Sequence, residues 1–131
     1  MITITTDKTL LDIDFIYGFL HKSYWAKDRT KAQIQETIAN SLCFGIFLSD
    51  KQIGFARVVT DKVIFSHLMD VFIAPEHQGK GYGKIVLETI YKHPDLINVT
   101  HHYLHTKDAH SFYQKIGFSQ YDKPKNVMLK H

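Results

Sequence analysis

The chain has 131 residues, a formal net charge of +3 and 44% hydrophobic residues, which predicts a single globular domain over residues 1–131. Its longest apolar run, Leu42 to Leu48, is too short to span a bilayer, the N-terminus lacks a signal-peptide pattern, and the single Cys43 excludes an internal disulfide. A cytoplasmic protein without a membrane or nucleic-acid partner is therefore expected, since the charge is weak and no basic-aromatic stripe is present.

The first half of the chain predicts strands and helices that follow from local spacing. Apolar residues alternate with threonines near the N-terminus, as in a strand. They then recur at helical spacing, and Thr30 is placed to cap a second helix. The expected elements are a strand over 2–6, helices over 12–23 and 31–40, and strands over 42–48 and 52–60.

The second half predicts the rest of a mixed α/β fold, in the order β-α-α-β-β-β-α-β-α-β. The long apolar run over 63–73 is typical of a central strand buried on both faces. Pro94 limits the helix before it, and Gly117 suits a left-handed helix C-cap. The expected elements are helices over 81–91 and 108–116, a strand over 99–105, and strands over 118–121 and 126–130 that finish the sheet.

The most informative segment joins the strand at 63–73 to the following helix. It reads Gln78-Gly79-Lys80-Gly81-Tyr82-Gly83-Lys84. Alternating glycines permit positive φ and bring backbone amides close to a ligand, and the helix N-terminus adds partial positive charge. The segment therefore predicts a phosphate or pyrophosphate site. It is neither a P-loop nor a dinucleotide fingerprint, because Gln78, Ile85 and Lys84 replace required residues.

The pattern Gln78-x-x-Gly81-x-Gly83 resembles the pyrophosphate loop of the GNAT superfamily, the acyl-coenzyme A-dependent N-acyltransferases. A second stretch, Ala109-x-x-x-Tyr113-x-Lys115-x-Gly117-Phe118, is similar to the family's other recurring motif. The resemblance covers the chain from Asp12 onward. It implies a mixed, mostly antiparallel sheet flanked by helices, and an N-acetyltransferase that moves an acetyl group from acetyl-coenzyme A (acetyl-CoA) to a primary amine by direct attack in a ternary complex.

The resemblance also implies where acetyl-CoA binds. The strand backbone at 71–73 pairs with the pantetheine arm, and the glycine segment holds the pyrophosphate. The implied cofactor-binding residues are Val71, Phe72, Ile73, Gln78, Gly79, Lys80, Gly81, Tyr82, Gly83, Lys84, Thr106, Ala109, Phe112 and Lys115. Thr106 stands where the family often has Asn, Phe112 also fits the core, and Lys115 also fits a solvated helix surface.

Three residues are candidates for catalysis. The family places a tyrosine at the position of Tyr113, where its hydroxyl donates to the leaving thiolate. Asp70, a lone carboxylate in an apolar strand, is a candidate base or acceptor anchor, and the alternative is a structural carboxylate. His67 is a second candidate base with an ordinary pKa near about 6.5, at a position where many members carry a carboxylate. The two side chains point to opposite faces of a regular strand, unless a β-bulge intervenes.

The remaining candidates concern the acceptor, metals and thiol chemistry. Tyr24 and Trp25 line the acceptor pocket by resemblance, or else anchor the turn between two helices. No metal site is predicted, because the nearby histidines at 101, 102 and 105 do not converge along a strand. Cys43 lies too far away for a covalent acyl-cysteine.

The sequence does not distinguish a small-molecule amine from a peptide amine as the acceptor. It also does not distinguish a monomer from a homodimer. A non-catalytic acyl-CoA sensor is the alternative function.

Overall fold

The computed structural model describes all 131 residues and is built on a five-stranded sheet in the order β1-β2-β3-β4-β5. The strands are β1 (Ile2–Thr5), β2 (Leu42–Leu48), β3 (Lys51–Thr60), β4 (Phe65–Ile73) and β5 (His101–Leu104). The first three pairings are antiparallel, and β5 joins β4 in parallel. The mixed, mostly antiparallel sheet expected from the sequence is confirmed.

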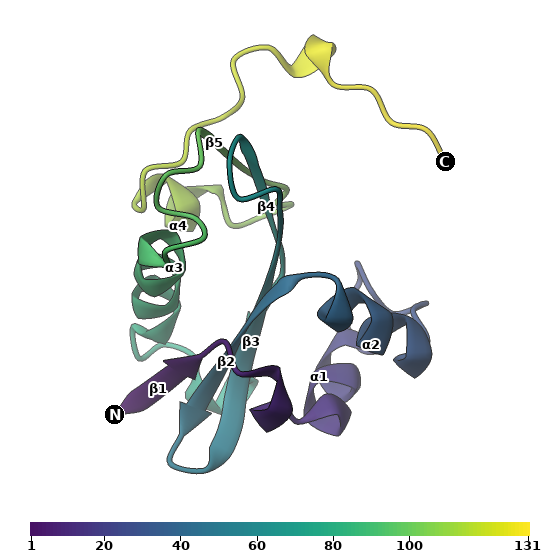
Figure 1. The fold of residues 1–131 in the computed structure, drawn as a ribbon, viewed down its shortest axis with the longest axis vertical. Helices are drawn as coiled ribbons and strands as arrows, with labels where there is room; N and C mark the ends of the chain where they lie inside the picture. Colours follow the sequence, from purple (N-terminus) through teal and green to yellow (C-terminus); the bar gives the residue numbers. More distant parts are fainter.

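Two helices cover each face of the sheet (Figure 1). The helices are α1 (Ile13–Leu20), α2 (Lys31–Ala39), α3 (Tyr82–Lys92) and α4 (His110–Gln114), with short 3₁₀ turns at Lys8–Leu10, Pro75–His77 and Pro124–Asn126. Helices α1 and α2 lie on one face, and α3 and α4 lie on the other. No helix combines the length and apolar character needed to cross a membrane.

The first two helices begin where local capping predicts. The Asp12 carboxylate accepts the backbone N–H of Phe15 at the start of α1. At the start of α2, the Thr30 hydroxyl accepts the N–H of Gln33, whose side chain accepts the N–H of Thr30 in return. This capping box satisfies backbone donors that the first helical turn leaves free, so the expected cap at Thr30 is confirmed.

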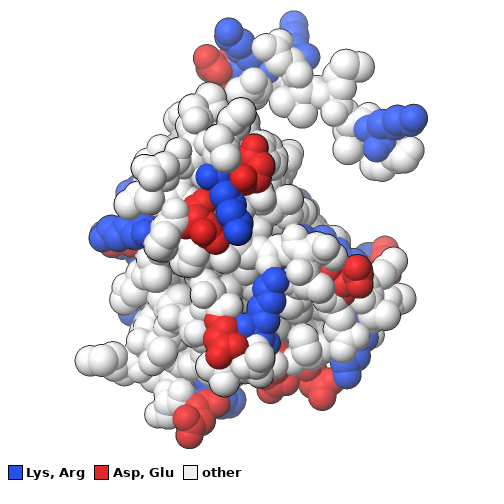
Figure 2. All heavy atoms as spheres, viewed as in Figure 1, with Lys and Arg blue, Asp and Glu red and all other residues white.

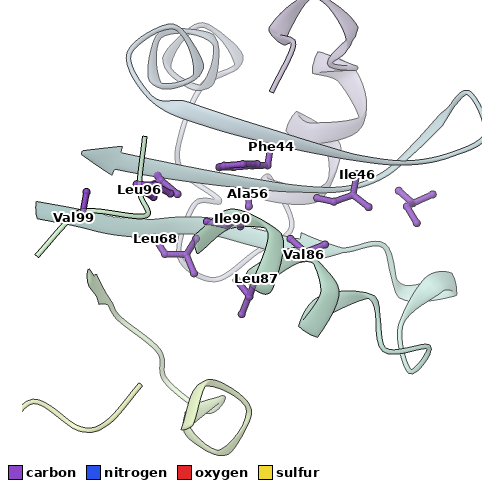
Figure 3. Packing of buried hydrophobic residues seen from close by; sticks show 11 residues of the cluster. Phe44, Ile46, Ala56, Leu68, Val86, Leu87, Ile90, Leu96 and Val99 are labelled. Atoms are coloured by element: carbon purple, nitrogen blue, oxygen red, sulfur yellow. The ribbon is translucent and has the colours of Figure 1, made fainter. Parts of the chain in front are cut away.

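The core has two parts, one on each face of the sheet. Figure 3 shows the larger part, in which α3 packs on β2, β3 and β4. Its buried members are Phe44, Ile46, Ile53, Ala56, Val58, Leu68, Val86, Leu87, Ile90, Leu96 and Val99. The second part joins α1 and α2 to the other face through Ile16, Leu20, Ala26, Ile34, Ile38, Cys43, Phe55 and Phe72. Apolar burial on both faces fixes the sheet between the helix pairs.

The strand buried on both faces is β3 rather than β4. Residues 52–58 of β3 are all buried, whereas burial alternates along β4. The expectation of two-sided burial for 63–73 is therefore wrong. The physical reason is position: β3 lies in the middle of the sheet between both helix layers, and β4 lies beside the short edge strand β5.

The two strands expected at the C-terminal end are absent. Residues 119–131 are exposed, and their only regular element is the turn at Pro124–Asn126. Figure 1 shows this segment leaving the body beyond β5. The expectation of strands over 118–121 and 126–130 is wrong for the single chain, because a strand requires a partner for its backbone groups and these residues pair with none.

Acidic and basic side chains are interspersed on the face drawn in Figure 2, and several lysines project with the C-terminal segment.

Candidate active site

The glycine-rich segment forms an open turn at the N-terminus of α3. Gly79 and Gly81 have φ of 78° and 82°, in the left-handed region where a side chain is strained. Gly81 is the N-cap of α3, and no side chain caps this helix. The amides of the first turn therefore point outward without helical partners. Such an arrangement attracts an anion.

Gly83 serves a different purpose from the one expected of alternating glycines. It lies inside α3 without positive φ, and an added Cβ would be 3.1 Å from the Phe112 ring. Phe112 belongs to α4, so the missing side chain lets the second motif pack against the first turn of α3. The structure thus brings the two sequence motifs into contact.

The glycine segment continues from an open edge of β4. The ladder with β5 ends at the pair Leu68 and Leu104, so the backbone of residues 69–73 has no strand on that side. The Gln78 Nε2 donates to the Ile73 carbonyl over 2.8 Å and ties the turn to the strand end. An unpaired strand edge leading to free helix amides suits an extended ligand that ends in a phosphate.

A β-bulge in β4 changes which side chains share a face. The register between β3 and β4 shifts at this point, and Asp70 within it has φ of 54°. On a regular strand, Leu68 and Phe72 would lie on the same face, because they are an even number of residues apart. Leu68 instead packs with α3, and Phe72 packs with α1 and α2 on the other face. The bulge therefore reverses the alternation, and His67 and Asp70 both lie on the α1–α2 side.

Asp70 is held by three side chains from other parts of the chain. Its two oxygens accept four hydrogen bonds, from Trp25 Nε1 at 2.8 Å, Arg29 at 2.9 and 2.8 Å, and Arg57 Nε at 2.9 Å. Burial raises the pKa of this carboxyl, but Arg57 and Arg29 together lower it by more than burial raises it, so the pKa lies below its usual 3.8. A buried carboxylate bonded in this way is a weak proton acceptor, and its geometry fits the structural alternative.

Sequence reasoning did not single out Arg29 or Arg57. Arg57 is the one charged residue in an apolar stretch of β3, and this was the available sequence signal. In the structure its side chain is buried, at 6% exposed. Arg29 carries no such signal, because it comes from the loop before α2 and meets Asp70 only through the fold.

His67 pairs with a histidine from the neighbouring segment. Its Nε2 lies 2.6 Å from Nδ1 of His105, and the rings stack with centroids 4.8 Å apart. Burial, then His105 and Arg57, lower the pKa of His67 below 6.5, so its imidazole is neutral at pH 7. His105 is exposed and so connects the pair to solvent. Sequence reasoning considered His105 only as a metal ligand, because the parallel pairing of β4 and β5 was not foreseen.

Tyr113 lies on α4, next to the second motif's other residues. The Thr106 hydroxyl accepts the N–H of Ala109 over 3.0 Å just before the helix, and Lys115 is exposed at its end. The Tyr113 ring meets Phe112 and Phe118 at centroid distances of 5.2 and 6.0 Å. Burial raises the pKa of Tyr113, so its hydroxyl stays protonated and remains a donor at neutral pH.

Tyr24 and Trp25 bring the α1–α2 loop to this region. Trp25 bonds Asp70 of β4, and the Tyr24 ring lies 5.1 Å from Lys107 Nζ in the segment before α4. Both aromatic side chains keep exposed surface, at 59% for Tyr24 and 39% for Trp25. The loop therefore contacts both β4 and the segment before α4.

The fold and the site define an acyltransferase of the GNAT kind. Residues 39–120 match the family model described as an acetyltransferase (GNAT) domain, and the chain belongs to this family of N-acetyltransferases. A Gibberella zeae protein whose name calls it a putative acetyltransferase is 30% identical, over 90% of this chain and 79% of its own.

Two solved structures have the same fold as this chain. A GNAT-family protein of Xanthomonas campestris pv. campestris, also described as a putative acetyltransferase, has a TM-score of 0.96 at 40% identity and covers 100% of this chain and 93% of its own. The PaiA N-acetyltransferase of Thermoplasma acidophilum, solved in complex with coenzyme A, has a TM-score of 0.70 at 19% identity and covers 93% and 92%. At that identity the second likeness shows the fold alone.

Proposed function

We propose that this acetyltransferase uses acetyl-CoA and acetylates a primary amine by direct attack in a ternary complex. The observation that carries the proposal is the uncapped N-terminus of α3, behind the left-handed Gly79 and Gly81 and beside the open edge of β4. A pyrophosphate fits the helix amides, and an extended pantetheine arm fits the free strand edge. Lys80 and Lys84 lie exposed beside this point and add positive charge.

The side chains around the bulge and on α4 supply the proton transfers. His67 is neutral and accepts the proton of the attacking amine, and His105 passes it to solvent. When bound, acetyl-CoA supplies the acetyl group and a thiolate leaving group. As the new C–N bond forms and the C–S bond breaks, Tyr113 donates its hydroxyl proton to the departing sulfur. Asp70 positions Trp25 and Arg29 and takes no proton.

The acceptor enters from the side of the α1–α2 loop. Tyr24 and Trp25 offer exposed aromatic surface there, and Trp25 is fixed by Asp70. Aromatic surface next to a neutral base suits an amine that loses its charge before attack. Small-molecule and peptide amines both satisfy this chemistry.

Thermal unfolding with acetyl-CoA, coenzyme A, ATP and NAD at matched concentrations tests cofactor use. A ligand at about 100 times its dissociation constant adds about 2.7 kcal/mol, which raises the midpoint by several degrees. We expect a rise with the two coenzyme A species only. Release of free thiol with a panel of amines then tests turnover, and binding without turnover by any amine would favour the non-catalytic sensor.

Two glycine variants, one in the proposed phosphate site and one far from it, serve as variant and control in the thermal unfolding test. Gly81→Ala strains a left-handed position and is expected to abolish most of the rise with coenzyme A. Gly18→Ala adds the same methyl group inside α1, where nothing lies within 4 Å, and should keep the full rise. An unchanged rise in Gly81→Ala would contradict the proposed phosphate site.

Tyr113→Phe is expected to lower kcat about 10²-fold, near the low end for loss of an acid catalyst, because thiolates are fair leaving groups. The KM for acetyl-CoA should change little, since the ring and its packing stay. Steady-state kinetics measure both constants, and Tyr17→Phe on α1 is the control. An unaltered kcat, with chemistry shown to be rate-limiting, would remove Tyr113 from the mechanism.

Cys43→Ala is expected to keep kcat within about twofold, because direct transfer needs no thiol. Cys43 is 1% exposed in the core between β2 and α2, and burial raises the pKa of its thiol to about 11. The variant leaves a small cavity and should lose roughly 1 kcal/mol of stability. Loss of activity in a folded Cys43→Ala protein would favour an acyl-cysteine instead.

A further inference from the structure

The outer edge of β5 is open, and a large cavity lies beside it. β5 is the last strand of the sheet and pairs only with β4. The cavity of about 1030 Å³ lies between α3, β5, α4 and residues 116–122, and none of the glycine segment lines it. Covering by another element is one of the ways in which proteins protect an unpaired strand edge.

A buried polar group in this cavity lacks a partner. Tyr91 of α3 lines the cavity, and its hydroxyl is buried without a hydrogen bond. Buried hydroxyls are satisfied in most native structures. The open strand edge and the unsatisfied hydroxyl both indicate that a further stretch of backbone belongs in this space.

The C-terminal segment has apolar side chains and backbone groups that no other part of the chain covers. Val127, Met128 and Leu129 are 59%, 94% and 80% exposed, an apolar run in open solvent. The hydrogen bonds within 119–131 stay inside its own turn at Pro124–Asn126. Figures 1 and 2 show the segment standing away from the body. Its sequence nevertheless predicts a strand over 126–130.

We propose that residues 126–130 of one chain pair with β5 of a second copy and fill its cavity, while the second copy's segment does the same in return. A second copy is the fitting occupant because each chain has one open edge and one unpaired strand segment. A two-fold exchange therefore satisfies both at once. Extended, the stretch from Asp122 to Lys130 spans about 30 Å, enough to reach across such an interface.

The exchange also completes the candidate active site. His105, Thr106 and Tyr113 line the same cavity as the free edge of β5. The partner's segment therefore forms a wall next to these residues. This dimer follows from strand edges and exposed apolar side chains, and does not depend on which substrate the enzyme uses.

Light scattering coupled to gel filtration tests the proposal on the full chain. A dimer is expected, and a variant that ends at Asp122 is expected to be a monomer. Leu129→Asp introduces a charge into the segment and should also give a monomer, whereas Lys125→Asp, in the preceding turn, should remain a dimer. Circular dichroism checks that each variant is folded.

Hydrogen exchange supplies the second readout. The His101 amide donates to the Ile64 carbonyl on the β4 side, so the alternating amides of His102 and Leu104 face the open edge. These two amides should exchange slowly in the full chain and at least tenfold faster in Leu129→Asp. A monomeric full chain, or a dimer that persists in either the shortened chain or Leu129→Asp, would overturn the proposal. A stable dimer without coenzyme A binding would leave it intact and count against the proposed cofactor alone.

Discussion

Asp70→Ala is expected to lower the free energy of unfolding by about 3–5 kcal/mol, the usual cost of removing one partner of a buried ion pair. Arg57 is 6% exposed and would keep its charge in the core without the carboxylate that now lies 2.9 Å away. Trp25 and Arg29 would lose their anchor on β4 as well. Urea unfolding followed by fluorescence measures the change.

Asp14→Ala is the matched control for the buried carboxylate. Asp14 also pairs with a cation, Lys31, but its side chain is 84% exposed, so the loss should stay below about 1 kcal/mol. A second variant, Asp70→Asn with Arg57→Met, removes both charges and should regain part of the lost stability. A loss in Asp70→Ala no larger than in Asp14→Ala would contradict the buried network.

The same network gives stability a defined pH dependence. The folded pKa of Asp70 lies below its unfolded value of about 3.9, so the unfolded chain binds the proton more tightly. The stabilisation is therefore complete above about pH 4 and is lost as the pH falls through the folded pKa. Asp70→Ala should flatten this part of the stability profile.

His67→Gln is expected to lower kcat/KM about 10²- to 10³-fold at pH 7, because the amine then loses its proton without a base. The pKa of His67 is lowered by burial, so the wild-type acid limb should lie below pH 6.5, with activity rising as His67 loses its proton. This limb should disappear in the variant. A pH profile of kcat/KM measures both effects.

His105→Gln separates the two members of the histidine pair. Its neighbour helps to keep the pKa of His67 low, so the acid limb should move upward toward pH 6.5, with a smaller loss of activity. His21→Gln on the α1 side, where the ring stacks on Tyr17, is the control and should leave the profile unchanged. A full loss in folded Asp70→Asn with an unaltered His67→Gln would assign the base to Asp70.

Elements whose signals are local could be predicted from the amino-acid sequence. The cap at Thr30, the span of β2, the glycine turn and the helix α3 that follows it depend on spacing and capping within a few residues, and these signals act before distant segments meet. The two motifs also identified the family. Gly79 and Gly81 are needed for the left-handed turn, and Gly83 is needed for the contact of α3 with Phe112.

The way in which distant residues meet depends on the pairing of the strands in the folded chain. The bulge at Asp70 puts His67 on the same face, and the parallel β4–β5 register brings His105 to it across 38 positions of sequence. Register depends on the pairing of whole strands, which residue spacing does not fix. The C-terminal strand is the clearest case: 126–130 has the composition of a strand, but a strand forms only against a partner edge, and within the single chain that segment pairs with no edge.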